Sequence, residues 1–252
     1  MLLHTEISGQ GQAVLLLHGL FGSYENLGVI ARQLENYQVI SMDLRNHGRS
    51  PWSDEMTYPA MAADVAETLQ HYGIGPLAVL GHSMGGKVAM QLALSRPELV
   101  NKLILADISP VLNKPRHQAI FAGLSAVAAT SVSSRQQADQ ILADHITEPG
   151  VRAFLLKSLQ KTEHGFSWRF NLAALANCYE DILQPPAAVG PYPGPTLFIK
   201  GGDSDYLLSE HQSLISTLFP HAKAKVIMGT GHWLHAEKPA AFAKLVNDFL
   251  LT

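Results

Sequence analysis

Short apolar runs alternate with amphipathic segments along most of the chain. The runs are rich in Val, Ile and Leu and are nearly continuous rather than alternating with polar residues. They cover residues 13–18, 37–42, 76–81, 102–107, 196–200 and 224–228. Continuous apolar strands are typical of a parallel sheet that is covered on both faces. The pattern therefore predicts six buried strands, and the N-terminus offers room for one further strand before residue 13.

The amphipathic segments between these runs predict helices. Apolar residues recur three or four positions apart in residues 26–34, 58–71, 84–94, 210–218 and 239–251. Strand and helix in repetition favour an α/β fold with a doubly wound, mostly parallel sheet.

One long stretch interrupts the alternation. Between about residues 114 and 183 the chain is rich in Ala, Gln and Leu, is helical in period and has no clear strand. We expect residues 1–112 and 190–252 to form the core and residues 113–189 to form an inserted helical cap. Such an insertion lies over the carboxyl ends of the strands, where ligands bind in open α/β sheets.

Composition and charge narrow the class of protein. Of the 252 residues 47% are apolar and 15% charged, and the net charge of −3 gives no reason to expect nucleic acid or an anionic membrane as partner. The single Cys178 has no partner for an internal disulfide. The chain start lacks the features of a signal peptide, and no apolar run reaches the roughly 18 residues of a membrane span. We expect a reduced, aqueous compartment, the cytoplasm.

The stretch VLGHSMGGKVAM, residues 79–90, carries the first candidate chemistry. It fits G-x-S-x-G, the template of a nucleophilic serine on a sharp turn between a strand and a helix. Ser83 is the candidate nucleophile, and the small residues Gly81 and Gly85 relieve the crowding of such a turn. The helix that begins near Met84 directs its N-terminal amides toward a developing oxyanion.

Two further segments supply partners for the serine. In LLLHGLFGS, residues 15–23, the backbone N–H of Leu20, with Phe21 as the alternative, would complete an oxyanion hole with that of Met84. In GTGHWLHAEKP, residues 229–239, His232 follows the last strand and is the candidate base. His235, three residues later, is the competing histidine.

Two carboxylates compete for the role of the acid. Asp205 in KGGDSDY follows the strand that precedes the strand of His232, and Asp107 in LADISP lies one strand earlier. Both fit the chain order serine, acid, histidine. Because neighbouring parallel strands lie about 5 Å apart, we expect Asp205 to be the acid, with Asp107 as the alternative. The polar turn DLRN, residues 43–46, is expected to brace the site.

Five blocks, HGLFGS, DLRNHGRS, GHSMGG, GGDSDY and GHWLHAEKP, occur in this order over nearly the whole chain. The chain resembles serine esterases of the α/β-hydrolase fold, and more narrowly the bacterial YbfF-type esterases. The resemblance implies Ser83 as nucleophile, His232 as base and the amides of Leu20 and Met84 as oxyanion hole. It also implies a helical cap, small acyl ester or thioester (acyl-CoA-like) substrates, an acyl-enzyme, and neither cofactor nor metal.

Aromatic residues are candidates for the substrate pocket. Phe21 and Trp233 flank the expected oxyanion hole and base, and Trp168 lies in the cap segment HGFSWRFNL, residues 164–172. The aromatic residues of that segment alternate, so they cannot all lie on one face of a helix. They either form the cap core, or one or two of them cover the acyl site.

Other functions share the same serine turn. A cofactor-free haloperoxidase and a C–C bond hydrolase of the same fold stay open as alternatives, as does a non-catalytic binding protein.

Overall fold

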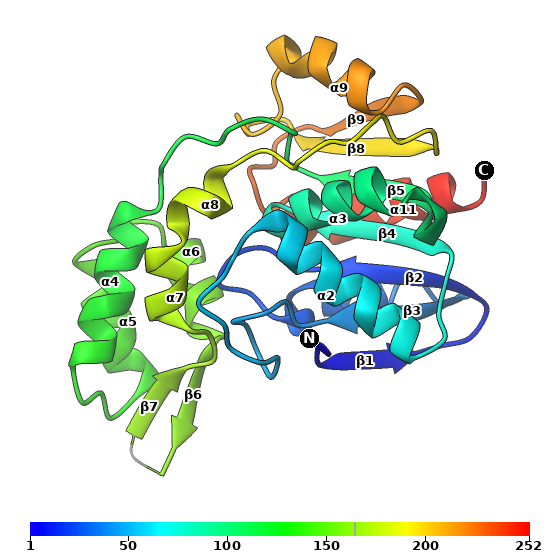
Figure 1. Ribbon diagram of the computed structural model, residues 1–252. Helices are drawn as coiled ribbons and strands as arrows, with labels where there is room; N and C mark the ends of the chain where they lie inside the picture. Colours follow the sequence, from blue (N-terminus) through cyan, green and yellow to red (C-terminus); the bar gives the residue numbers. More distant parts are fainter. Residues whose placement is uncertain (164) are drawn as a thin grey trace.

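The computed structural model describes residues 1–163 and 165–252. Within this described chain, seven strands form one sheet in the order β1-β3-β2-β4-β5-β8-β9 (Figure 1). The strands are β1 (Thr5–Ser8), β2 (Gln12–Leu17), β3 (Tyr37–Met42), β4 (Leu77–His82), β5 (Val100–Ala106), β8 (Thr196–Gly201) and β9 (Ala222–Ile227). Neighbouring strands are parallel except β1 and β3, which are antiparallel. The six predicted strands and the α/β fold class are confirmed, and β1 is the further strand near the N-terminus.

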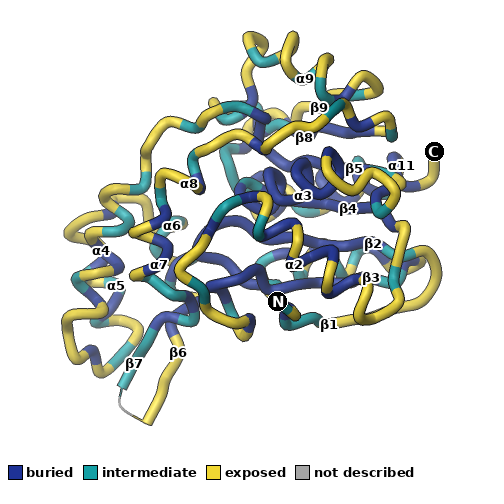
Figure 2. The backbone as a smooth tube through the Cα atoms, in the orientation of Figure 1, coloured by how far each residue is buried: buried dark blue, intermediate teal, exposed yellow. Residues whose placement is uncertain are grey.

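Helices cover both faces of the sheet, which explains why the strands are apolar throughout. The helices α2 (Tyr58–His71) and α3 (Met84–Ser95) lie in front of the sheet in Figure 1, and α11 (Pro239–Leu250) lies behind it. Along β2, Leu15 and Leu17 belong to one buried cluster and Val14 and Leu16 to the other. Burying each such side chain stabilises the fold by about 1.5–3 kcal/mol. The sheet is accordingly buried along its central strands in Figure 2.

Two predicted helices of the core begin differently from the prediction. The segment 26–34 forms the 3-10 helix η1 (Tyr24–Leu27) followed by one turn of α-helix, α1 (Gly28–Ala31). The segment 210–218 begins as the 3-10 helix η3 (Ser209–His211) and continues as α9 (Gln212–Leu218). Between α3 and β5 lies a third 3-10 helix, η2 (Pro97–Leu99).

The chain between β5 and β8 leaves the sheet and lies at the carboxyl ends of the parallel strands, on the left of Figure 1. We call residues 113–189 the cap segment. Its helices are α4 (Gln118–Ala129), α5 (Arg135–Ala143), α6 (Pro149–Leu156), α7 (Leu172–Asn177) and α8 (Tyr179–Leu183).

The expectation that the cap segment has no strand is wrong. An antiparallel hairpin, β6 (Leu159–Thr162) and β7 (Gly165–Trp168), follows α6. The alternation of Phe166 and Trp168 was the signal, because side chains of a strand repeat with a period of two. His164, the first residue of the predicted aromatic segment, lies outside the described residues.

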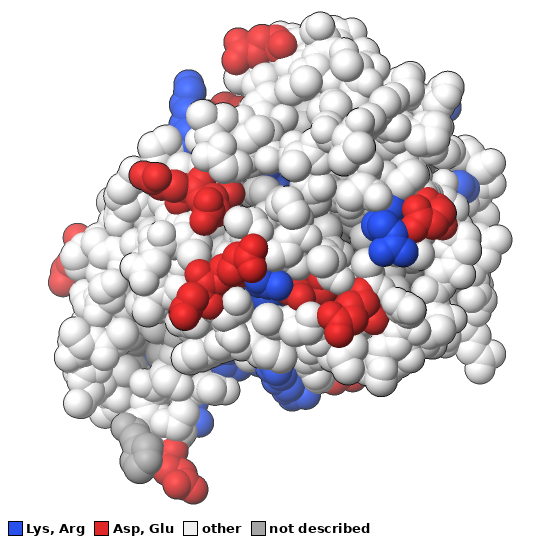
Figure 3. All heavy atoms as spheres, viewed as in Figure 1, with Lys and Arg blue, Asp and Glu red and all other residues white. Residues whose placement is uncertain are grey.

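The surface carries few charges. On the face drawn in Figure 3, acidic side chains form small groups and basic side chains are scattered, without an extended basic patch. No helix in the part of the chain that the structure describes is long and apolar enough to span a membrane.

Candidate active site

The turn between β4 and α3 holds Ser83 in a strained backbone conformation. Its φ of 54° and ψ of −120° lie outside the regions that L-residues ordinarily adopt, at a cost of about 1–3 kcal/mol. The turn is held by hydrogen bonds from the Ser83 N–H to the Ala106 carbonyl (3.1 Å) and from the Gly86 N–H to the Ser83 carbonyl (2.9 Å). The side chain of Ser83 therefore stands at the carboxyl edge of the sheet.

The glycines of the motif are required by close backbone contacts. A Cβ atom on Gly81 would lie 2.2 Å from the carbonyl oxygen of Gly85, and one on Gly85 would lie 2.4 Å from that of His18. Such distances are far shorter than any carbon–oxygen van der Waals contact. Both positions therefore exclude a side chain, as the sequence analysis predicts for small residues around the turn.

His232 connects Ser83 to a buried carboxylate. Its Nε2 lies 2.9 Å from the Ser83 hydroxyl oxygen, and its Nδ1 lies 2.7 Å from Oδ2 of Asp107. Because a carboxylate only accepts, Nδ1 carries the proton, and Nε2 accepts from the Ser83 hydroxyl. Asp107 is fully buried, and it also accepts from the Gly201 N–H (3.0 Å) and the Ser204 hydroxyl. These donors compensate the buried charge.

The expectation that Asp205 lies beside His232 is wrong. The Asp205 side chain is 64% exposed and forms an ion pair with Arg116 of the cap segment (2.6 Å), which lowers its pKa below the ordinary value. Asp107 directly follows β5, whereas Asp205 lies four residues beyond the end of β8, so its loop carries it outward. The loop of His232 also lies against the end of β4, because Nε2 of His82, the last residue of β4, donates to the His232 carbonyl (2.9 Å).

The loop after β2 brings a second free amide to Ser83. A Cβ atom on Gly19 would lie 3.3 Å from that of Ser83. The Phe21 N–H donates to His47 Nε2 (3.2 Å), so the alternative donor is already used. Among the described residues, no acceptor is found for the Leu20 N–H, and the Met84 N–H belongs to the first turn of α3, where amides lack intrahelical partners. Leu20 and Met84 thus offer two amide donors beside the serine.

Polar residues brace these loops from below. Within the turn DLRN, Arg45 pairs with Asp64 (2.6 Å) and Asp43 accepts from the Tyr24 N–H (2.8 Å). His18 accepts at Nε2 from the Leu44 N–H (3.0 Å), and burial lowers its pKa to about 4, so it stays neutral. The turn therefore has the bracing place that the sequence analysis expects.

His235, the competing histidine, lies in the short helix α10 (Leu234–Glu237). Its ring is buried and packs against His82, with 4.4 Å between the ring centroids. Burial lowers its pKa to about 3. The Ser83 hydroxyl is hydrogen-bonded to His232 and not to His235, so the preference for His232 agrees with the geometry.

Two cavities adjoin His232, and the inner one also reaches Ser83. An inner cavity of about 30 Å³ is lined by Ser83, Phe21 and Trp233, together with Ile120 and Val151 of the cap segment. An outer cavity of about 550 Å³ shares His232 and Trp233 with it. The inner cavity is therefore much the smaller of the two.

Phe21 and Trp233 lie where the sequence analysis places them, but Trp168 does not. Its Nε1–H donates to the Leu124 carbonyl (3.1 Å), its ring stacks on Phe170 (5.3 Å between centroids), and it lines neither cavity. Trp168 belongs to the cap core, the alternative that the sequence left open. The cap residues that line the inner cavity lie on α4, on α6 or, for His117, directly before α4, and no sequence motif marks them.

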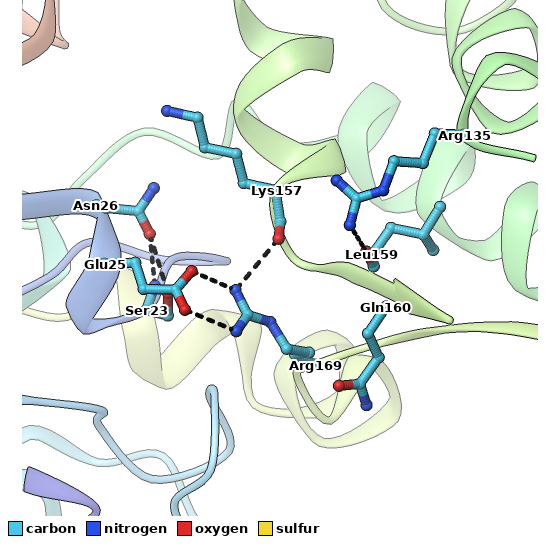
Figure 4. Close-up of a pocket in the computed structure, with 8 residues that line it drawn as sticks. All are labelled: Ser23, Glu25, Asn26, Arg135, Lys157, Leu159, Gln160 and Arg169. Carbon is cyan, nitrogen blue, oxygen red and sulfur yellow. Dashed lines mark hydrogen bonds and ion pairs between the residues drawn. The ribbon is translucent and has the colours of Figure 1, made fainter. Parts of the chain in front are cut away.

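A separate pocket of about 380 Å³ lies between the core and the cap segment (Figure 4). Across it Arg169 pairs with both carboxylate oxygens of Glu25 (3.2 and 2.8 Å), and Arg135 donates to the Leu159 carbonyl (2.7 Å). Beside it the Ser158 hydroxyl donates to the Phe21 carbonyl (2.8 Å), inside the loop that carries Leu20. Polar contacts around this pocket thus hold the cap segment against the core, next to the loop that carries Leu20.

The described residues offer no site for a metal ion. Of the residues that the structure describes, no three His, Cys, Asp or Glu side chains are grouped so that they could hold a metal ion.

Comparisons with known proteins agree with this geometry. Residues 14–245 match the model of the alpha/beta hydrolase family. The chain is 43% identical to Esterase YbfF of Escherichia coli strain K12, over 94% of this chain and 92% of that protein. It is 41% identical to the sn-1-specific diacylglycerol lipase ABHD11 of Mus musculus, over 94% of this chain and 80% of that protein. A solved structure called Marine microorganism esterase superposes with a TM-score of 0.95 at 36% identity, covering 98% of this chain and 99% of that one. The sheet order, the serine turn and these matches together show that the chain belongs to the alpha/beta hydrolase family, as a hydrolase of the esterase and lipase type.

Proposed function

We propose that the protein is a serine hydrolase that cleaves carboxylic esters or thioesters of small molecules through an acyl-enzyme. The observation that carries the proposal is the continuous hydrogen-bonded chain from Ser83 through His232 to the buried Asp107. A serine hydroxyl becomes nucleophilic when an adjacent base removes its proton. The names of the similar esterases and lipase support an ester substrate.

The geometry accounts for each step of such a reaction. His232 Nε2 takes the proton of Ser83 as its oxygen attacks the acyl carbon, and Asp107 stabilises the resulting imidazolium. The amides of Leu20 and Met84 receive the developing oxyanion, and one such donor contributes about 3 kcal/mol to transition-state stabilisation. His232 then protonates the leaving alcohol or thiol, and a water activated by His232 releases the acid.

The cavities suggest where the two halves of the substrate lie. His232, which must protonate the leaving atom, lines both cavities, whereas Ser83 and Leu20 line only the inner one. We place the alcohol or thiol in the outer cavity, which is the larger of the two, and the acyl group in the inner one.

Replacement of Ser83 tests the proposal. Ser83→Ala is expected to abolish hydrolysis of p-nitrophenyl acetate and of acetyl-CoA, and to abolish labelling by a fluorophosphonate probe, because the attacking oxygen is gone. The exposed Ser95, at the end of the same helix, offers a matched control. Ser95→Ala should retain labelling and turnover.

Thermal unfolding of both variants establishes that they fold. Hydrolysis at the wild-type rate by a folded Ser83→Ala variant would refute the proposed mechanism.

A further inference from the structure

His117 is a cap residue that the proposed mechanism leaves without a role. It precedes α4 and lines both the inner and the outer cavity, at the boundary that the two share with His232. Its ring packs edge-on against Phe21, with 6.2 Å between centroids. His117 is thus one of the residues that border the passage between the outer cavity and Ser83.

The contacts of Tyr179 determine which nitrogen of His117 carries the proton. The Tyr179 hydroxyl oxygen accepts from the backbone N–H groups of Arg116 and His117, each at 3.2 Å. A phenol that accepts two hydrogen bonds still has its own proton to donate. That proton points to Nδ1 of His117, which lies 2.6 Å from the hydroxyl oxygen. Nδ1 is therefore an acceptor, and the neutral ring carries its proton on Nε2.

The His117 ring is neutral at neutral pH. Burial is the main cause that lowers the pKa of His117 to about 4, and the neighbouring His232 and Arg116 lower it further. No described residue accepts a hydrogen bond from Nε2 of His117. The Nε2–H of His117 is thus a neutral donor that is available to a ligand at the boundary between the two cavities.

We propose that His117 Nε2–H is a specificity-determining donor for a second acceptor oxygen in the leaving group. The inference rests on the proposed function, which places the leaving group in the outer cavity, where His117 and His232 both lie. A hydroxyl, ether or carbonyl oxygen a few bonds from the scissile ester would accept this proton. Esters of oxygenated alcohols are therefore preferred to esters of plain alkyl alcohols.

Two acetate esters of equal length separate this effect from general reactivity. Butyl acetate and 2-methoxyethyl acetate differ by one methylene in place of an ether oxygen. Acetic acid release gives kcat/KM for each ester, and the ratio of the two is compared between variants, so that their intrinsic reactivities cancel. In His117→Phe, the ratio in favour of the ether is expected to fall about 3- to 10-fold, the effect of one neutral hydrogen bond.

Two further variants test the assignment of the proton. His117→Gln should keep most of the preference, because the glutamine amide places an N–H close to the position of Nε2. Tyr179→Phe keeps the ring but removes the hydroxyl that donates to Nδ1, and it should lower the ratio although His117 is present. An unchanged ratio in a folded Tyr179→Phe variant would show that the Tyr179 hydroxyl is not needed to present Nε2–H, and would overturn the role assigned to Tyr179.

The outcome for His117 is distinguishable from the outcome for Ser83. If His117→Phe slows both esters equally, its ring acts only by packing against Phe21, and the inference is wrong while the serine mechanism stands. If Ser83→Ala still hydrolyses the two esters, the proposed function itself fails.

Discussion

At the scale of single residues, the position of one carboxylate decides the chemistry. Asp107 accepts from His232, Gly201 and Ser204, and it is fully buried. Asp205 is mostly exposed and bound to Arg116. An exposed ion pair contributes only about 0–1 kcal/mol, whereas the carboxylate at His232 determines the tautomer of the base.

Asparagine at these two positions should therefore have unequal effects. Asp107→Asn is expected to lower kcat by about four orders of magnitude, because the amide no longer stabilises the Nδ1–H tautomer and the imidazolium. Asp205→Asn, the matched control, is expected to change kcat by less than about fivefold. Initial rates on an aryl ester measure both. Similar losses in the two variants would contradict the assignment.

At the scale of elements, the contact between α3 and β2 holds the serine turn in place. Gly85 lies in the first turn of α3, against the carbonyl oxygens of Leu17 and His18 at the end of β2. With any residue other than glycine at position 85, α3 could not approach the end of β2 this closely. Met84 and its free amide would then move away from Leu20.

Alanine substitutions test this contact. Gly85→Ala is expected to destabilise the protein by about 3 kcal/mol or more, because the added Cβ overlaps backbone atoms that cannot rotate away. Gly150, in the first turn of α6, has nothing within 4 Å of a built Cβ. Gly150→Ala should leave stability equal or slightly higher. Urea unfolding measures both, and equal midpoints would show that α3 can shift.

At the scale of the whole molecule, four histidines buried in the core and the partly buried His117 of the cap segment share one electrostatic property. Burial lowers the pKa of all five: His18, His47, His82, His117 and His235. Several act as acceptors, as His47 does for the Phe21 N–H. Protonation would turn such an acceptor into a donor that faces another donor.

The fold should therefore be sensitive to acid. Each of these rings has a folded-state pKa below the unfolded value of about 6.5, so below that pH the unfolded chain binds more protons. The free energy of unfolding should fall as pH decreases, by roughly 1 kcal/mol per pH unit for each ring. The fall ends for each ring at its folded-state pKa, which is about 4 for His18 and about 3 for His47.

Urea midpoints at pH 7.5 and pH 5.0 measure this loss, and a lower midpoint is expected at pH 5.0. The exposed His221 is the control, because His221→Gln should leave the difference between the two midpoints unchanged. Equal midpoints of the wild type at the two pH values would contradict the role of the buried rings.

The sequence by itself determined the features that depend on neighbouring residues. Short continuous apolar runs identified the core strands, and the spacing of glycines around Ser83 identified the turn, because both are set within a few residues. The alternation of Phe166 and Trp168 also carried a local signal, but it lay in a segment whose composition favoured helices. Only the tertiary structure decided which carboxylate meets His232, since that depends on where each loop ends after its strand. It also decided that Trp168 packs inside the cap and that Tyr179, 62 residues from His117, sets the proton of that ring, because these contacts join segments that come together only when the chain folds.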